Sequence, residues 1–345
     1  MTKLFKLINA LENIRKIPQF LFLEGVHPYS MFAVRKAVLN FKKENPDIQE
    51  IDFIINSPGG SAPDAYRIIR TLRNNFETVN IIVPFWAKSA ATLLALGGSS
   101  IIMDEFAEFG PLDAQIAKEK DDSPYYERES ALNDEHSLDR IETRYKMMYQ
   151  SMYLDMYEND KISIHKNLLS KQLLNASLKF YEPLLKQINP YRLGEKRRIL
   201  DLGKDYAEKI LAQFNSTIST KKSILLVDYL VNRCSDHGFI IDYNTISIFL
   251  GDTVKESKEI SAEYANALTD LSGYLIDPNT DDFNYVDFVK QIEEEPTDEG
   301  EDGNIEKAVQ EILHNGLDKV ESENGKINVV DKTKITKKTL NGKEN

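Results

Sequence analysis

The sequence has almost no cysteine and no excess of positive charge. Cys234 is the only cysteine among 345 residues, which excludes an internal disulfide framework and any metal site built from several cysteines. A chain of this kind suits a reducing compartment, so a cytoplasmic location is expected. The formal net charge of -12 argues against a general nucleic-acid-binding protein, because such proteins meet phosphates with an excess of lysine and arginine.

Membrane spans and nucleotide-binding loops are also missing. No stretch reaches the roughly 18 uninterrupted apolar residues of a transmembrane helix, since the most apolar window, 81–96, contains Pro84 and Lys88. No secretory signal is evident in 1–17, whose amphipathic helical pattern leaves peripheral membrane association open beside packing on the core. No P-loop and no G-x-G-x-x-G turn is found, so energy-driven unfolding of a substrate would require another protein.

The informative part of the chain is 51–115. Short apolar runs at Ile51–Asn56, Val79–Val83 and Ser100–Met103 are typical of buried strands, as is Gln19–Glu24 further upstream. Helical patterns separate these runs, which predicts an α/β fold with parallel strands and right-handed crossovers.

Two turns in this part combine features that suit acyl chemistry. Gly59-Gly60 ends one strand, where glycine lets the main chain approach a ligand closely. Ser89 opens a helix of small and leucine residues shortly after the next strand. Free backbone N–H groups at such places stabilise a developing oxyanion, and Gly60 and Ala90 are the best-placed donors. Each feature alone is more often a simple turn or helix cap, so the prediction depends on their combination.

The segments Glu44–Gly60 and Ala87–Gln115 resemble known peptidases. ENPDIQEIDFIINSPGG is similar to the segment before the oxyanion loop of Clp-type peptidases. AKSAATLLALGGSSIIMDEFAEFGPLDAQ resembles the signature of the serine dehydrogenase proteinases, a group similar to signal peptide peptidase A. The resemblance implies a Clp/crotonase-type spiral of repeated β-β-α and βαβ units with a helical extension. It also implies Ser89 as the nucleophile, Gly60 and Ala90 as the oxyanion hole, and no metal or organic cofactor.

The general base is not fixed by the resemblance. Clp-type peptidases carry a histidine on the strand after the nucleophile helix, and 108–113 contains none. His237 is a candidate because a neutral imidazole accepts a serine proton, and Asp236 or Asp242 could orient it. His27 and an unassigned lysine are the alternatives. Lys88 is a poor direct base, because adjacent helical residues point apart.

The rest of the chain divides by composition. We expect an amphipathic helix at 1–17, a catalytic core at 18–120, a helical extension that could form oligomerisation arms at 121–220, and a helix-strand region at 221–289. Residues 290–345 begin with an acidic run and end rich in lysine, which is typical of a largely disordered tail.

These observations favour a serine endopeptidase that forms an acyl-enzyme on Ser89 and acts on a peptide or protein substrate. Two rivals use the same scaffold. One is a crotonase-type acyl-CoA enzyme, which a basic coenzyme pocket would favour, and the other is a catalytically weak assembly scaffold. The resemblance to Clp-type peptidases also implies a homo-oligomer.

Overall fold

The computed structural model describes residues 3–112, 115–118, 127–159, 161, 163–215, 218–277 and 285–289. The expectations for the tail from 290 onward, and for a boundary near 120, lie outside these residues. The division into domains therefore stays a prediction.

A six-stranded sheet forms the centre of the fold, in the order β10-β1-β2-β3-β5-β9. Five strands are parallel and β10 is an antiparallel edge paired with β1. The strands of this sheet are β1 (Gln19–Leu23), β2 (Glu50–Ile55), β3 (Thr78–Val83), β5 (Ser100–Met103), β9 (Val254–Glu256) and β10 (Tyr285–Phe288). The four strands expected from the apolar runs are therefore confirmed to within one residue at each end.

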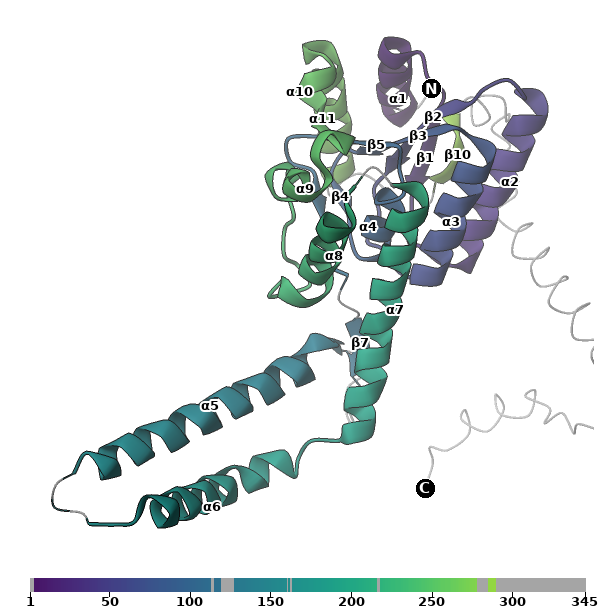
Figure 1. Ribbon diagram of the computed structural model, residues 1–345. Helices are drawn as coiled ribbons and strands as arrows, with labels where there is room; N and C mark the ends of the chain where they lie inside the picture. The colour runs from purple at the N-terminus through teal and green to yellow at the C-terminus, as the bar shows by residue number, and fades with distance from the viewer. Residues whose placement is uncertain are drawn as a thin grey trace, which may run out of the picture. The chain divides into compact units, whose positions relative to one another are not determined.

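Helices cover both faces of this sheet (Figure 1). Side chains alternate between the faces, as strand geometry requires. Phe20, Phe53 and Ile81 point into the larger core beneath α2 and α3, whereas Leu21 and Ile54 point toward α1 and α11. The helices are α1 (Lys3–Arg15), α2 (Pro28–Glu44), α3 (Ala62–Asn75), α4 (Ala90–Ala95), α5 (Leu132–Tyr157), α6 (Lys166–Leu185), α7 (Pro190–Phe214), α8 (Thr220–Asp228), α9 (Tyr243–Leu250), α10 (Ser257–Ile260) and α11 (Ala262–Ile276).

A second, smaller layer of pairing lies just beyond the carboxyl ends of the main strands. The short strands β4 (Trp86–Ala87) and β6 (Glu108–Phe109) pair with each other, and isolated bridges join Ser57 to Ala87, Phe109 to Ile241 and Val26 to Gly60. Each main strand from β1 to β5 is thus followed by a short extended segment. This repeat of long strand, short strand and helix is the predicted β-β-α pattern, and the fold class is confirmed.

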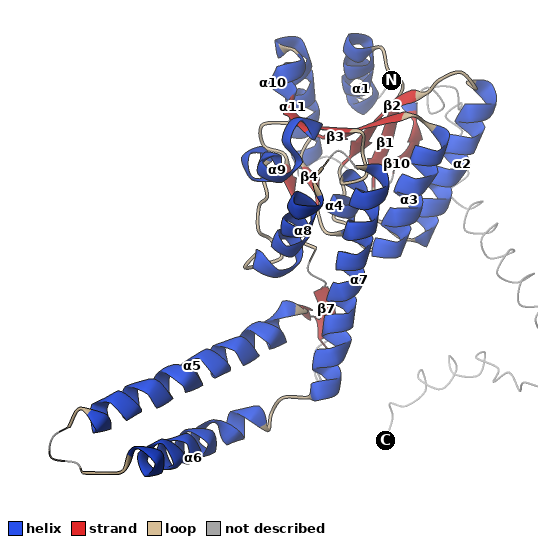
Figure 2. Cartoon of the chain, viewed as in Figure 1, coloured by secondary structure: helices blue, strands red, loops and turns tan. Residues whose placement is uncertain are grey.

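The helical region after the sheet consists mainly of three long helices. Figure 2 shows α5 and α6 side by side and α7 as one continuous helix. A small antiparallel pair, β7 (Gln115–Lys118) and β8 (Glu127–Ser130), precedes α5. A one-turn π-helix (Tyr229–Arg233) and a 3-10 turn (Gly251–Thr253) complete the described elements. Among the described residues, no helix is both long and apolar enough to span a bilayer.

Candidate active site

Ser89 occupies a strained turn between β4 and α4. Its backbone has φ 51° and ψ -117°, a region that residues other than glycine rarely enter. Ser89 precedes α4 as its N-cap residue, yet its side chain makes no capping hydrogen bond. Such strain costs on the order of 1–3 kcal/mol and recurs at functional sites. The hydroxyl of a half-buried serine is therefore left available for another role.

The Gly59-Gly60 turn packs directly against this serine. Both glycines have positive φ, 92° for Gly59 and 142° for Gly60. A Cβ on Gly59 would lie 2.3 Å from the Lys88 carbonyl oxygen and 2.9 Å from the Ser89 Cβ. Only glycine allows the two turns to approach so closely, which explains why the sequence places a glycine pair there.

Gly60 and Ala90 each offer one backbone N–H in the two turns that meet at Ser89. Val26 donates its N–H to the Gly59 carbonyl and accepts from the Ser61 N–H, so the N–H of Gly60 faces the other way. Ala90 is the first residue of α4, and its N–H has no intrahelical acceptor. Within the described residues, neither amide has a hydrogen-bond acceptor. The arrangement leaves two backbone donors beside the Ser89 turn.

Thr92 anchors the segments on either side of the Ser89 turn. Its buried hydroxyl lies 2.7 Å from the Ala87 carbonyl and 2.8 Å from the Gly110 carbonyl. Lys88 turns toward Gly110 and forms an ion pair with Glu108, with 2.5 Å between Nζ and Oε1. That pairing agrees with the expectation that Lys88 is a poor direct base.

The predicted site residues line a common cavity of about 350 Å³. Ser89, Gly60, Ala90 and His237 all line it. Its apolar wall is built by Leu93, Leu112, Ile199 and Leu202, together with Gly203. Ile199, Leu202 and Gly203 belong to α7. The sequence analysis did not single them out, because their pattern is that of an ordinary helix.

His237 reaches the cavity from a segment far along the chain. Phe109 and Ile241 exchange two backbone hydrogen bonds of 2.9 and 3.1 Å, and Leu112 donates to the Leu230 carbonyl. These bonds tie the segment 230–241 to the loop after β6. His237 therefore lines the same cavity as Leu112, which belongs to the histidine-free stretch 108–113.

The carboxylates suggested as partners of His237 have local roles. Asp236 accepts a hydrogen bond of 2.8 Å from the Gly238 N–H. Asp242 caps α9 and accepts from both the N–H and the hydroxyl of Thr245. The Thr245 hydroxyl contributes most to lowering the pKa of Asp242, which favours the ionised cap.

His27 is engaged elsewhere. Its Nδ1 accepts from the Ser30 N–H at the start of α2, and its Nε2 lies 2.7 Å from a Glu24 oxygen. Ser30 in turn accepts from the His27 N–H, which completes a capping box. One ring nitrogen thus serves the cap of α2 and the other contacts Glu24, and His27 does not line the cavity.

Comparison with known proteins identifies the segment that carries this site. Residues 16–140 match the family model described as ClpP-like SDH-type serine proteinase. The matched stretch is about a third of the chain. The family segment contains Gly60, Ser89 and Ala90, whereas α7 and His237 lie beyond it.

Two relatives come from Methanocaldococcus jannaschii. The uncharacterized protein MJ0137 is 35% identical over 98 residues, which are 28% of this chain and 34% of the relative. The uncharacterized protein MJ1495 is 27% identical over 215 residues, covering 54% of this chain and 73% of the relative. The match thus spans only about a third of the first relative's length.

Solved structures with detectable similarity include two peptidases. A mutant of the 1510-N membrane-bound stomatin-specific protease is 14% identical, with coverage of 45% of this chain and 68% of that chain, at a TM-score of 0.28. A mutant of ClpP1 from Listeria monocytogenes is 19% identical, covering 30% of this chain and 58% of that chain, at a TM-score of 0.25.

Proposed function

We propose that this protein is a serine peptidase that cleaves peptide bonds through an acyl-enzyme on Ser89. The observation that carries the proposal is the shared cavity, which Ser89, Gly60, Ala90 and His237 all line. Membership of the family segment in a serine proteinase family supports the same reaction class.

In the proposed reaction, the Ser89 hydroxyl attacks the carbonyl carbon of the substrate while His237 takes the hydroxyl proton. The N–H groups of Gly60 and Ala90 donate to the oxyanion of the tetrahedral intermediate. The C–N bond then breaks, and the proton on His237 passes to the leaving amine. Water, deprotonated by His237, hydrolyses the ester and releases Ser89.

His237 is preferred as base among the described residues that line the cavity, because it is the one that carries an imidazole, the side chain that most often acts as a general base. The acyl-CoA rival called for a basic coenzyme pocket. The described lining contains neither lysine nor arginine, so the feature that would favour the rival is not observed there.

Labelling by a fluorophosphonate probe tests the nucleophile. Native protein should be labelled and Ser89→Ala should not, whereas Ser137→Ala, an exposed serine on α5, should label as native protein does. Absence of labelling in well-folded native protein would overturn the proposal.

A test of His237 must distinguish the loss of a general base from the loss of a folded site. His237→Ala should slow labelling by about 10²–10⁴-fold, and added imidazole should restore part of the rate. A His237→Ala variant that labels at the native rate would exclude His237 as the base and leave Ser89 in place.

A further inference from the structure

The backbone of Lys88 is held at several points, one residue before the strained turn at Ser89. Its N–H donates to the Ser57 carbonyl at 3.0 Å, and its own carbonyl accepts from the Ala91 N–H at 2.9 Å. The same carbonyl packs against Gly59. Lys88 therefore connects β4, the glycine turn and the first turn of α4, so a shift of its backbone would also move Ser89.

The side chain of Lys88 forms a sheltered ion pair on the outer face of the β4–β6 pair. Ala87 and Phe109 lie opposite each other and face the core, so Lys88 and Glu108, which flank them, share the other face. The two charged side chains are only 12% and 15% exposed, and Lys88 Nζ lies 2.5 Å from Glu108 Oε1. Water and salt screen such a pair less than an exposed one, so it restrains both side chains.

Gly110 provides the room that this ion pair needs. It follows the last paired residue of β6 and lies beside Lys88. A Cβ on Gly110 would lie 2.6 Å from Cδ and 3.1 Å from Cα of Lys88. The aliphatic part of the lysine thus packs on bare backbone, and a larger residue at this position would push on the side chain and the main chain of Lys88.

We propose that Glu108 is a positioning residue for Ser89 and that it acts through Lys88. The ion pair holds the Lys88 side chain against β6, and the Lys88 backbone in turn holds the strained turn at Ser89. Neither Lys88 nor Glu108 lines the cavity, so both act without touching the substrate. The inference rests on the proposed function, because positioning matters only if Ser89 is the nucleophile.

The time course of fluorophosphonate labelling tests this role. Glu108→Gln keeps the shape of the side chain and removes its charge, which leaves the Lys88 cation without its partner. We expect labelling of Ser89 to slow about 10–100-fold, because small displacements of a reacting group change rates by this order. Its final extent should stay native, because a misplaced serine reacts slowly whereas an unfolded fraction does not react.

A reversed ion pair tests whether the charges act together. Lys88→Glu combined with Glu108→Lys restores one charge of each sign on the same face of β4 and β6. The double variant should recover most of the labelling rate that Glu108→Gln loses. Recovery of this kind requires the pair itself, because each substitution alone leaves a sheltered charge unmatched.

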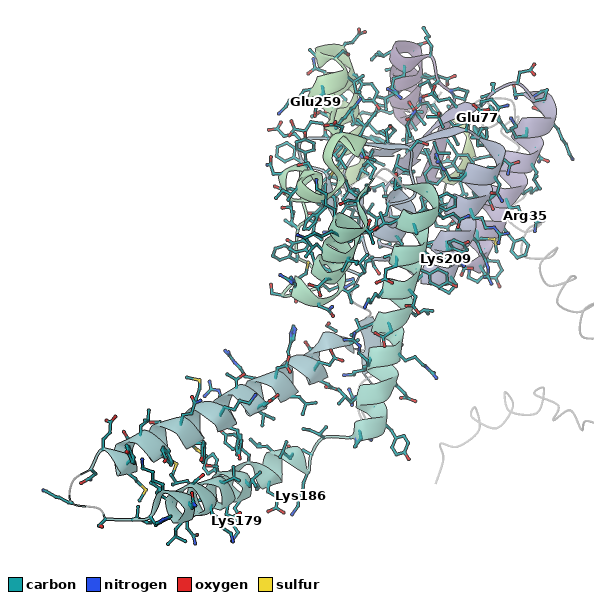
Figure 3. All side chains as sticks on the ribbon, in the orientation of Figure 1. Arg35, Glu77, Lys179, Lys186, Lys209 and Glu259 are labelled. Carbon is teal, nitrogen blue, oxygen red and sulfur yellow. The ribbon has the colours of Figure 1, made fainter. Side chains whose placement is uncertain are left out.

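Gly110→Ala tests the same contact without changing any charge. The added methyl group would push on Lys88 and should slow labelling as Glu108→Gln does. Glu182→Gln is the matched control, because Glu182 forms an ion pair of 2.7 Å with Lys186 on the surface of α6 (Figure 3). This control should label at the native rate.

Trp86 reports on the same turn whether or not Ser89 reacts. It is the only tryptophan in the sequence, it lies opposite Glu108 in the β4–β6 pair, and its ring stacks on Phe85. Loosening of the turn in Glu108→Gln or Gly110→Ala should expose this ring and raise its quenching by acrylamide. The reversed pair should bring quenching back toward the native value.

A native labelling rate in either Glu108→Gln or Gly110→Ala would overturn the inference. A reversed pair that stays as slow as Glu108→Gln would do the same, and so would a native rate with a reduced extent, which indicates partial unfolding. If native protein is not labelled at all, the proposed function fails and Trp86 decides separately. Unchanged quenching in both variants would then show that the ion pair does not hold the turn, whereas increased quenching would support it.

Discussion

Ser89 and Gly60 show how single residues shape the site. Both have positive φ, and only Gly60 has it without steric cost. Gly59 lies in close contact with the Lys88 carbonyl, and the bridge between Gly60 and Val26 ties the glycine turn to the segment after β1. The strain at Ser89 is thus supported by neighbours on two different strands.

Gly60→Ala tests the contribution of this turn. A Cβ at this position would lie 2.2 Å from the Val26 carbonyl oxygen, so the turn must move and its N–H must leave the cavity. We expect fluorophosphonate labelling of Ser89 to slow by about 10²–10³-fold, the usual effect of losing one oxyanion donor.

Gly194→Ala is the control for that experiment. Gly194 lies within α7, and no heavy atom would come within 4 Å of the added Cβ. Alanine in a helix should raise the free energy of unfolding by about 0.5–1 kcal/mol and leave labelling unchanged. Native-like labelling of Gly60→Ala would show that its N–H is not a donor.

That Ser89, Gly60 and Ala90 lie close together was predictable because the signal is local. A strand, a glycine turn and a serine before a helix occupy one short part of the chain. Gly203 and Ile199 were not predictable in the same way, because α7 meets the cavity only through tertiary packing. Whether His237 acts as base stays a prediction, although it lies in the same cavity.

At the level of elements, a buried polar group joins α1 to the sheet. Asp52 on β2 accepts two hydrogen bonds from Arg15 at the end of α1, 2.6 and 3.0 Å long. Gln19 and Asn80, on the flanking strands, also donate to its carboxylate. A buried charge with this many partners is well satisfied, which fixes α1 over one position of the sheet.

Arg15→Ala should therefore be strongly destabilising, because it leaves the carboxylate of Asp52 buried without its cation. We expect the free energy of unfolding to fall by about 3–5 kcal/mol, measured by urea denaturation. Lys146→Ala removes an exposed ion pair with Glu142 and should change the free energy of unfolding far less, because solvent screens that pair. Equal losses in the two variants would contradict this account.

The central strands were predictable from their apolar runs, whereas the edge strands were not. β9 has three residues and β10 has four, and both contain acidic side chains. Such short segments have too little pattern to distinguish a strand from a loop. Their place in the sheet is set by β5 and β1, which offer an open edge for pairing.

At the scale of the whole described fold, α7 connects two parts. Its Lys196 and Arg197 pair with Asp134 and Glu135 at the start of α5, and one turn later Ile199 and Leu202 wall the cavity. Because this wall is apolar, the proposed peptidase should prefer an apolar residue beside the bond that it cleaves.

Gly203→Leu tests that preference. The new side chain would start 3.4 Å from the Leu112 carbonyl oxygen and extend into the cavity. Cleavage beside a large apolar residue should fall about tenfold or more, while the small fluorophosphonate should still label Ser89. Gly194→Leu, two turns earlier on α7, should change neither. Loss of labelling in Gly203→Leu would show damage to the site rather than altered specificity.

Because α7 is one continuous helix, the direction in which its ion-paired end faces also fixes the direction in which its cavity-lining residues face. Each residue of an α-helix turns the chain by about 100°. Inserting one residue between Arg197 and Ile199 would therefore rotate the cavity wall away from Ser89, or rotate the ion-paired end away from α5. Only insertions close to whole turns preserve both contacts. The number of residues between the ion-paired end of α7 and the cavity wall is thus constrained. Related chains can lengthen this part of the helix only by about four or seven residues if both contacts are to be kept.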